Sequence, residues 1–428
     1  DIIVRHLEEY GVKDVFLLSG GGMMHLLDSV FSSKKIHTWC NLNEQATTIC
    51  SDAYAQATGD LAVCMVTSGP GATNAITGAV NSWIDSEPVL VISGQAKSTD
   101  LVGDRGVRQT GSQEVNITAM MQPVTKYAVM VKKANEIKYH LDKAIYLATH
   151  GRRGTVWIDV PLDIQGAQIE ESELLEFDPA AEGLVPAFSV TDEDCDEILR
   201  MMREAKRPLI LAGKGVQADK MGQTLRELCK QLQIPALATW RAKMIFAEDD
   251  PLYFGHPGSP GPRYSNWILQ TCDFILIIGT RLNPGVTAFN EPHFACRAKR
   301  VIVDIDANEI KKLNMDFAKT LVCDAAGFLT QLKTQALGMP PCDTEHWLKY
   351  CREAKAAYPL YKETQYFPQQ QTNMYLFGHE LSLRTRKEDV IVEGSSGRSC
   401  GIIGLSYERQ DGQTEIGAMG LGSMGFAL

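Results

Sequence analysis

Two glycine-rich turns and one glutamate are the groups in this sequence whose types and spacing best suit chemistry. The first turn spans residues 19–22 and the second spans residues 67–74, and each follows an apolar run and precedes a helical pattern. Glycines in such turns let backbone N–H groups approach a ligand closely, so both turns are candidates for binding an anion. Pro70 interrupts the glycine pattern of dinucleotide-binding turns, which argues against that ligand.

Glu44 is the glutamate, and its residue type allows two roles. Residues 41–44 read Asn-Leu-Asn-Glu and fit a capping box, in which the Glu44 carboxylate accepts a hydrogen bond from the N-cap amide of a helix. The second role is that of a carboxylic acid that exchanges a proton with a ligand, which a glutamate can do when partial burial raises its pKa. Capping is the simpler interpretation of Glu44 taken alone.

The elements around these groups follow an alternating pattern. Strand-like runs lie at residues 14–18, 61–67, 88–93 and 155–160. Between them, small and apolar residues recur at helical spacing, as in the segment that ends at Gly59. This alternation predicts parallel βαβ units in an open sheet, whose ligands bind beyond the carboxyl ends of the strands.

The chain is expected to divide into three blocks, at residues 1–168, 190–338 and 372–428. An acidic stretch at 170–186 and a polar, tyrosine-rich stretch at 359–371 have the composition of linkers. The predicted fold class is therefore α/β, with three doubly wound parallel-sheet domains of which the last is truncated. Both chain ends are expected to be cut, because the sequence starts at Asp1 and stops inside a glycine-rich stretch.

Composition excludes several classes of function. A net charge of −10 argues against a nucleic-acid partner, because phosphate backbones need basic stripes. Eleven cysteines without a C-x-x-C pair indicate free thiols in a reducing compartment, so we expect a cytoplasmic protein without disulfides or zinc. No apolar run reaches the roughly 18 residues of a membrane span, and no signal peptide is recognisable.

Several motifs, taken in order, resemble the acetolactate synthase branch of the thiamine-diphosphate-dependent enzymes. They lie at residues 19–22, 44–46, 67–74, 93–95, 113–114, 154–161, 294–306 and 422–425. Any one motif could arise by chance, but the ordered set is specific and covers nearly the whole chain. The resemblance implies a pyrimidine-binding domain, a central Rossmann-like domain and a diphosphate-binding domain, which correspond to the three blocks.

The resemblance also implies roles for single residues. Glu44 would hydrogen-bond the aminopyrimidine of the cofactor and so activate it, Met424 would hold the cofactor bent, and the Gly422 carbonyl would bind its amino group. Plain core filling is the alternative for Met424. The implied cofactor-binding residues are Gly20, Gly21, Glu44, Pro70, Asn74, Gly422, Ser423 and Met424. The implied catalytic residues are Glu44, Gln113 and His25.

The implied reaction is decarboxylation of a 2-oxo acid, with pyruvate as the expected substrate, followed by carboligation to a second carbonyl. The alternatives are acetyl transfer to a keto-sugar nucleotide, simple decarboxylation or lyase activity, and a non-catalytic cofactor-binding subunit. Three departures from the family pattern, Ser112, His25 and Leu162, fit a larger or more polar acceptor. His25 is either a packed structural residue or an acid that polarises the acceptor carbonyl.

The remaining expectations concern cofactors and partners. The Mg²⁺-binding motif of the family is expected beyond Met424, so no metal ligand can be named in this chain. FAD is a candidate, because residues 255–262, 279–281 and 304–306 fall where the family binds it. A homodimer or homotetramer is implied, in which Glu44 and Gln113 of one subunit face the diphosphate-binding block of another.

Overall fold

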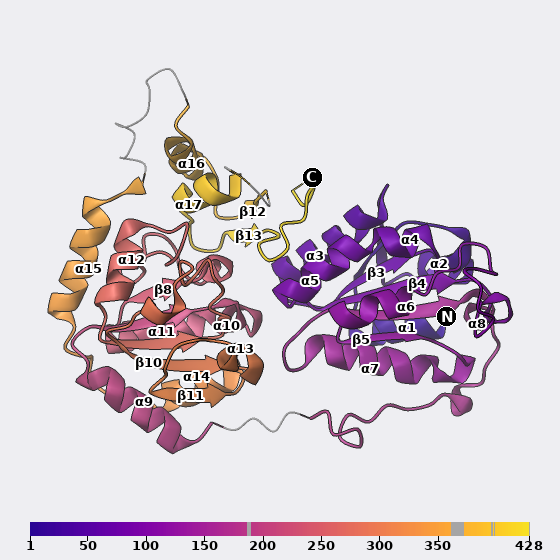
Figure 1. The fold of residues 1–428 in the computed structure, drawn as a ribbon, viewed down its shortest axis with the longest axis horizontal. Coiled ribbons are helices and arrows are strands. Elements are labelled where there is room, and N and C mark those ends of the chain that lie inside the picture. The colour runs from indigo at the N-terminus through magenta and orange to yellow at the C-terminus, as the bar shows by residue number, and fades with distance from the viewer. Residues whose placement is uncertain (186–189, 361–371, 395–396, 398, 428) are drawn as a thin grey trace. The chain divides into compact units, whose positions relative to one another are not determined.

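The computed structural model describes residues 1–185, 190–360, 372–394, 397 and 399–427. The chain forms two compact units, one of Asp1–Pro186 with Ile416–Leu428 and one of Ala187–Glu415 (Figure 1). Residues 372–415 of the third predicted block therefore group with the central block, and the last residues group with the first. The predicted α/β class with parallel sheets is confirmed.

The first unit is built on a six-stranded parallel sheet in the order β2-β1-β3-β4-β6-β5. Its strands are β1 (Asp14–Leu17), β2 (His37–Cys40), β3 (Ala62–Val66), β4 (Val89–Gln95), β5 (Tyr127–Met130) and β6 (Val156–Pro161). The four strand-like runs of the sequence correspond to β1, β3, β4 and β6. The sequence pattern missed β2 and β5, which are the two edge strands and lack the fully buried pattern of β3, β4 and β6.

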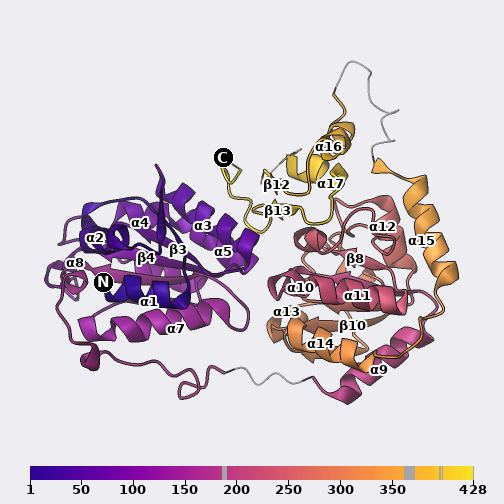
Figure 2. The ribbon, with the colours of Figure 1, turned by 180° about the vertical axis from the view of Figure 1, so that it is seen from behind.

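Helices cover both faces of this sheet (Figure 2). They are α1 (Ile2–Tyr10), α2 (Met24–Ser32), α3 (Glu44–Thr58), α4 (Pro70–Asn74), α5 (Ile76–Asp85), α6 (Ile117–Met121), α7 (Ile137–Thr149) and α8 (Leu162–Gln165). Alternate residues of a strand point to opposite faces, so Val63 and Met65 of β3 pack with α1, α2 and α7. Their neighbours Cys64 and Val66 pack in the other core, with α3 and α5.

The second unit has a five-stranded parallel sheet in the order β11-β10-β9-β7-β8 over one continuous core. Its strands are β7 (Pro208–Ala212), β8 (Ala236–Ala238), β9 (Phe274–Ile278), β10 (Lys299–Asp304) and β11 (Lys319–Val322). Its helices are α9 (Asp192–Glu204), α10 (Lys214–Ala218), α11 (Gly222–Leu232), α12 (Arg263–Thr271), α13 (Ala307–Lys311), α14 (Ala325–Gln335), α15 (Glu345–Ala357), α16 (Met374–Ser382) and α17 (Gly404–Ser406). Two short strands, β12 (Val390–Val392) and β13 (Thr414–Ile416), pair with each other.

Within the described part of the chain, no helix combines the length and the apolar character that crossing a bilayer requires.

Candidate active site

The first glycine turn lies flat against the second, at the carboxyl ends of β1 and β3. A Cβ atom at Gly20 would meet the Cβ of Thr67 at 2.4 Å, so only glycine fits there. The Gly22 amide donates a hydrogen bond to Thr67 Oγ1 at 3.1 Å. Gly21, between them, has open space where a side chain would stand. The turn is thus held on one side and leaves the backbone at Gly21 accessible to a ligand.

The turn at 67–74 continues into α4 and carries Pro70 and Asn74 at the two ends of that helix. Gly69, which precedes it, has a φ of +59°, a left-handed conformation that favours glycine. A Cβ atom at Gly71 would lie 2.6 Å from Thr67 Cγ2 and 3.4 Å from Glu44 Oε1. The missing side chain at Gly71 therefore leaves room for the Glu44 carboxylate beside α4.

Glu44 is the first residue of α3, and its carboxylate points to α4. Glu44 Oε2 accepts a hydrogen bond from Asn74 Nδ2 at 3.1 Å. The N-cap of α3 is Asn43, whose side chain accepts hydrogen bonds from the amides of Gln45 and Ala46. The capping-box interpretation of residues 41–44 is therefore wrong, because Glu44 stands one residue after the N-cap and not three. Its half-buried carboxylate is left for the site.

Gln113 belongs to the loop between β4 and α6 and reaches the second glycine turn through its backbone. A Cβ atom at Gly69 would lie 2.5 Å from the Gln113 carbonyl oxygen, so the two segments are in close contact. Gln113 itself is exposed and has a φ of +57°. The structure thus brings Gln113 to the same turn that carries Asn74 and Gly71.

His25 lies on the first turn of α2 with its imidazole against α8. A Cβ atom at Gly166, just after α8, would be 3.0 Å from His25 Nε2. The residue is exposed on its other sides, which fits neither a fully packed side chain nor a buried acid. A catalytic role for His25 stays a prediction.

Gly422, Ser423 and Met424 lie on the first unit of the same chain, against α3 and α5. Ser423 is buried and donates a hydrogen bond to Asn81 Oδ1 at 3.1 Å. Gln45 Nε2 donates to the Met424 carbonyl oxygen at 3.2 Å, next to Glu44. The Met424 side chain is 83% exposed, so the alternative that it fills a core is wrong. An exposed thioether beside the start of α3 is free to contact a ligand.

Polar residues that the sequence analysis missed hold these parts together. Gln165 Nε2 donates to the carbonyl oxygens of Gly22 and Val160, both at 2.8 Å, and so fixes the first glycine turn to β6. Gln56 donates to the Gly417 carbonyl oxygen at 3.1 Å and accepts from the Gly417 amide at 3.0 Å. In the sequence, each of these glutamines is only a polar residue within a helical segment, and that pattern does not reveal its hydrogen-bond partner.

The second unit places the segments expected to bind FAD at strand ends. Residue 279 follows β9 and residue 304 ends β10, and these strands are neighbours in the sheet. A Cβ atom at Gly279 would lie 2.8 Å from the Cα of Gly215, in α10, the helix that follows β7. Adjoining strand ends of this kind suit the binding of a dinucleotide in open α/β sheets. FAD binding itself stays a prediction. Among the described residues, no cluster of three His, Cys, Asp or Glu side chains suits a metal ion.

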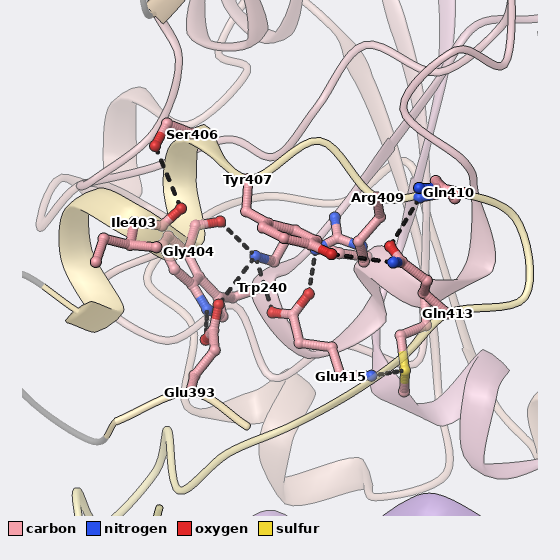
Figure 3. A network of polar contacts seen from close by, with 12 residues as sticks. Trp240, Glu393, Ile403, Gly404, Ser406, Tyr407, Arg409, Gln410, Gln413 and Glu415 are labelled. Atoms are coloured by element: carbon pink, nitrogen blue, oxygen red, sulfur yellow. Dashed lines mark hydrogen bonds and ion pairs between the residues drawn. The ribbon is translucent and has the colours of Figure 1, made fainter. Parts of the chain in front are cut away.

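A buried charge network joins Glu393, Arg409 and Glu415 to Lys243, which belongs to the short helix Trp240–Ile245 after β8 (Figure 3). Lys243 lies 3.1 Å from Glu415 Oε1 and 3.7 Å from Glu393 Oε1, and Arg409 pairs with Glu415. Burial raises the pKa of Glu393 to about 7, whereas the two cations hold the pKa of Glu415 far below its usual range despite burial. The network borders a cavity of about 620 Å³ that is also lined by His256, whose side chain is buried.

Known protein families match both units. The family described as "Thiamine pyrophosphate enzyme, N-terminal TPP binding domain" matches residues 1–120, and "Thiamine pyrophosphate enzyme, central domain" matches residues 195–332. The chain is 33% identical over 356 residues to the "Probable acetolactate synthase large subunit" of Methanocaldococcus jannaschii, covering 83% of this chain and 59% of that protein.

Two further relatives match along the full chain. It is 31% identical to the "Acetolactate synthase large subunit" of Corynebacterium glutamicum, covering 100% of this chain and 66% of that protein. It is 30% identical to the "Acetolactate synthase" of Mycobacterium leprae, covering 100% of this chain and 67% of that protein. The chain thus spans between 59% and 67% of the length of these three relatives.

Proposed function

Because the chain belongs to the thiamine pyrophosphate enzyme family and is similar there to acetolactate synthase large subunits, we propose that it is part of a thiamine-diphosphate-dependent carboligase. The enzyme decarboxylates a 2-oxo acid, pyruvate, and joins the remaining two-carbon unit to a second carbonyl compound. The observation that carries this proposal is the position of Glu44 at the start of α3, with its carboxylate bonded to Asn74 and facing Gly71.

The residues on the first unit fit thiamine diphosphate. Gly21 leaves an open approach to the first turn, Glu44 is half-buried beside the second, and Met424 exposes a large apolar side chain next to them. When bound, thiamine diphosphate supplies a carbon nucleophile and accepts the electron pair that stays behind when CO₂ leaves.

The chain's own residues bind and orient this cofactor. Glu44 would hydrogen-bond the aminopyrimidine ring and exchange a proton with it, and Asn74 holds the Glu44 carboxylate in place by donating a hydrogen bond to Oε2. Met424 would offer apolar surface to the cofactor, and the Gly422 carbonyl would accept a hydrogen bond from its amino group. Ser423 anchors this segment through Asn81. Gln113 lies at the second turn, where a substrate carbonyl would approach.

The test is product analysis by mass spectrometry with pyruvate, Mg²⁺ and thiamine diphosphate on the full-length protein. We expect an acetolactate-type product, and we expect Glu44→Gln to slow its formation by about 10²–10⁴-fold, the range typical of a lost general acid or base. Glu353→Gln, an exposed glutamate on α15, is the matched control and should leave the rate unchanged. Full activity of Glu44→Gln would refute the assigned role.

The acceptor is proposed to be a second pyruvate or a larger carbonyl compound. Ser112 and His25, two of the departures from the family pattern, are both exposed in the structure and so leave room for a polar acceptor. Adding a keto-sugar nucleotide to the assay distinguishes the two, because the mass of the product reports the acceptor. Release of free acetaldehyde would instead identify a simple decarboxylase, and failure to bind thiamine diphosphate in calorimetry would identify a non-catalytic subunit.

We further propose a cytoplasmic homodimer or homotetramer that requires Mg²⁺ and carries FAD in the central unit. Leu42, two residues before Glu44 on the first unit, is 99% exposed, which suits contact with a second copy. Light scattering on a sizing column measures the mass of the assembly. The flavin absorbance of the purified protein reports FAD, and loss of activity with a chelator reports the metal.

A further inference from the structure

Four side chains on the neighbouring strands β4 and β6 form a buried hydrogen-bonded chain that ends on a loop of the active site. Trp157 Nε1 donates to Ser93 Oγ at 2.8 Å, and Ser93 Oγ donates to Asp159 Oδ1 at 2.6 Å. Gln95 Nε2 donates to Asp159 Oδ2 at 2.9 Å. All four residues are at most 2% exposed. The Asp159 carboxylate thus accepts hydrogen bonds from two neutral side chains that come from the adjacent strand.

Gln95 is the member of this chain that reaches the loop. The same Gln95 Nε2 also donates to the Val115 carbonyl oxygen at 2.9 Å, and Gln95 Oε1 accepts from the Ala96 amide at 2.9 Å. The amide of Gln95 is therefore held at three points. Asp159 sets its orientation, because an ionised carboxylate only accepts hydrogen bonds and so must face the NH₂ end of the amide. Val115 stands two residues after Gln113, so this contact fixes the end of the loop that carries Gln113.

The loop between residues 97 and 116 is tied down at other points as well. Asp163 accepts a hydrogen bond from the Ser98 amide at 2.9 Å, at the start of the loop. Glu114 accepts hydrogen bonds from the amides of Val102 and Gly111, at 2.6 and 3.0 Å, and so closes the loop on itself. These contacts fix the loop's start and its interior, whereas Gln95 fixes its end to the sheet.

Gln113 needs such support because of its backbone. Its φ of +57° is a left-handed conformation that residues other than glycine rarely adopt and that persists only where surrounding contacts hold it. Its carbonyl oxygen also lies against Gly69, where a Cβ atom would be 2.5 Å away. A small shift of residues 113–115 would therefore move Gln113 off the second glycine turn.

We propose that Gln95, oriented by Asp159, is a positioning residue that sets Gln113 against the second glycine turn. This inference rests on the proposed function, since Gln113 is assigned to the reacting centre only there. Gln95 acts through the Val115 carbonyl and not on the substrate. Burial raises the pKa of Asp159 to about 7, and the hydrogen bonds from Ser93 and Gln95 oppose that rise.

The experiment compares Gln95→Leu with Thr155→Val in the full-length protein. Thr155 lies just before β6, at the opposite end of the strand, and donates a buried hydrogen bond to the Ala79 carbonyl oxygen at 3.0 Å. Loss of this hydrogen bond weakens the same sheet without affecting the loop. Thr155→Val therefore controls for a purely structural effect of Gln95→Leu. Three quantities are measured: kcat and KM for pyruvate, the Kd for thiamine diphosphate, and hydrogen exchange of peptides from residues 97–116.

For Gln95→Leu we expect faster exchange in the loop and a fall in kcat of about 10- to 100-fold, as for a displaced group at a reacting centre, with cofactor affinity within about twofold. Thr155→Val should keep kcat within about twofold and leave exchange in the loop unchanged. Unchanged loop exchange in Gln95→Leu would overturn the inference, and so would a kcat that falls equally in both variants.

The two proposals fail in different ways. A wild-type protein that makes no carboligation product contradicts the proposed function, while faster loop exchange in Gln95→Leu alone still supports the contact through Val115. Asp159→Asn adds a second test, because an Asn amide facing Gln95 Nε2 sets donor against donor or frees one of the two bonds. We expect it to reproduce the faster loop exchange of Gln95→Leu, and normal loop exchange in Asp159→Asn would contradict the orienting role.

Discussion

The contact between Gly71 and Thr67 gives a sharp test of how the two halves of the second glycine turn fit together. A methyl group at Gly71 would stand 2.6 Å from Thr67 Cγ2, a separation at which something must move. Overpacking of this kind typically costs about 1–3 kcal/mol. Its other neighbours, Glu44 Oε1 at 3.4 Å and Thr67 Cβ at 3.6 Å, are at ordinary contact distance. The cost of Gly71→Ala should therefore arise almost wholly from one methyl group.

Thr67→Ser removes that methyl group and keeps the hydroxyl that accepts from the Gly22 amide. Alone it should cost about 1 kcal/mol for the lost methyl. In the Thr67→Ser background, Gly71→Ala should cost nothing or stabilise slightly, because alanine favours a helix over glycine by about 1 kcal/mol. The double-mutant cycle should thus give a coupling free energy of about 1–3 kcal/mol in favour of the pair.

Differential scanning calorimetry measures this coupling, with the transition of the first unit assigned by hydrogen exchange of peptides from β3. For a unit of this size, 1 kcal/mol corresponds to about 2–4 °C in Tm. Gly21→Ala is the matched control, because nothing lies within 4 Å of the added methyl. Additive effects of Gly71→Ala and Thr67→Ser, or an equal loss from Gly21→Ala, would refute the steric reasoning.

Two further predictions concern the first unit. Asn43→Ala removes the N-cap of α3 and should lower the free energy of unfolding by about 1 kcal/mol, seen in calorimetry as a lower Tm, and an unchanged Tm would mean that the cap is not needed. Asp159 has its pKa raised from 3.8 to about 7, so the folded protein retains a proton that the unfolded chain has lost, and its contribution to stability falls as pH rises from 4 to 7. The stability of Asp159→Asn relative to wild type should therefore improve by about 2–3 kcal/mol between pH 5 and pH 8 in urea titrations, and a pH-independent difference would contradict the raised pKa.

Local patterns in the sequence were enough to predict the framework of the site. The strands β1, β3, β4 and β6 are apolar runs, and glycines come shortly after both β1 and β3. Because ligands of open α/β sheets bind beyond the carboxyl ends of the strands, both turns were expected at that edge, and the observed strand order places β1 beside β3. The family resemblance carried by the ordered motifs then pointed to Glu44, Asn74 and Gln113, and the structure brings these three to the second turn.

Contacts between distant segments decided the rest. Taken alone, residues 41–44 favoured a capping role for Glu44, which the family resemblance outweighed. The folded chain gives the cap to Asn43 and turns Glu44 toward Asn74, thirty residues away. For Met424 the motif favoured a ligand contact over core filling, and its exposure follows only from how residues 416–427 pack on α3. The bond between Gln95 and Asp159 exists because β4 and β6 are neighbours in the sheet although β5 separates them in sequence. Periodicity and turn chemistry act over a few residues, whereas strand order and the burial of a polar side chain depend on the whole fold.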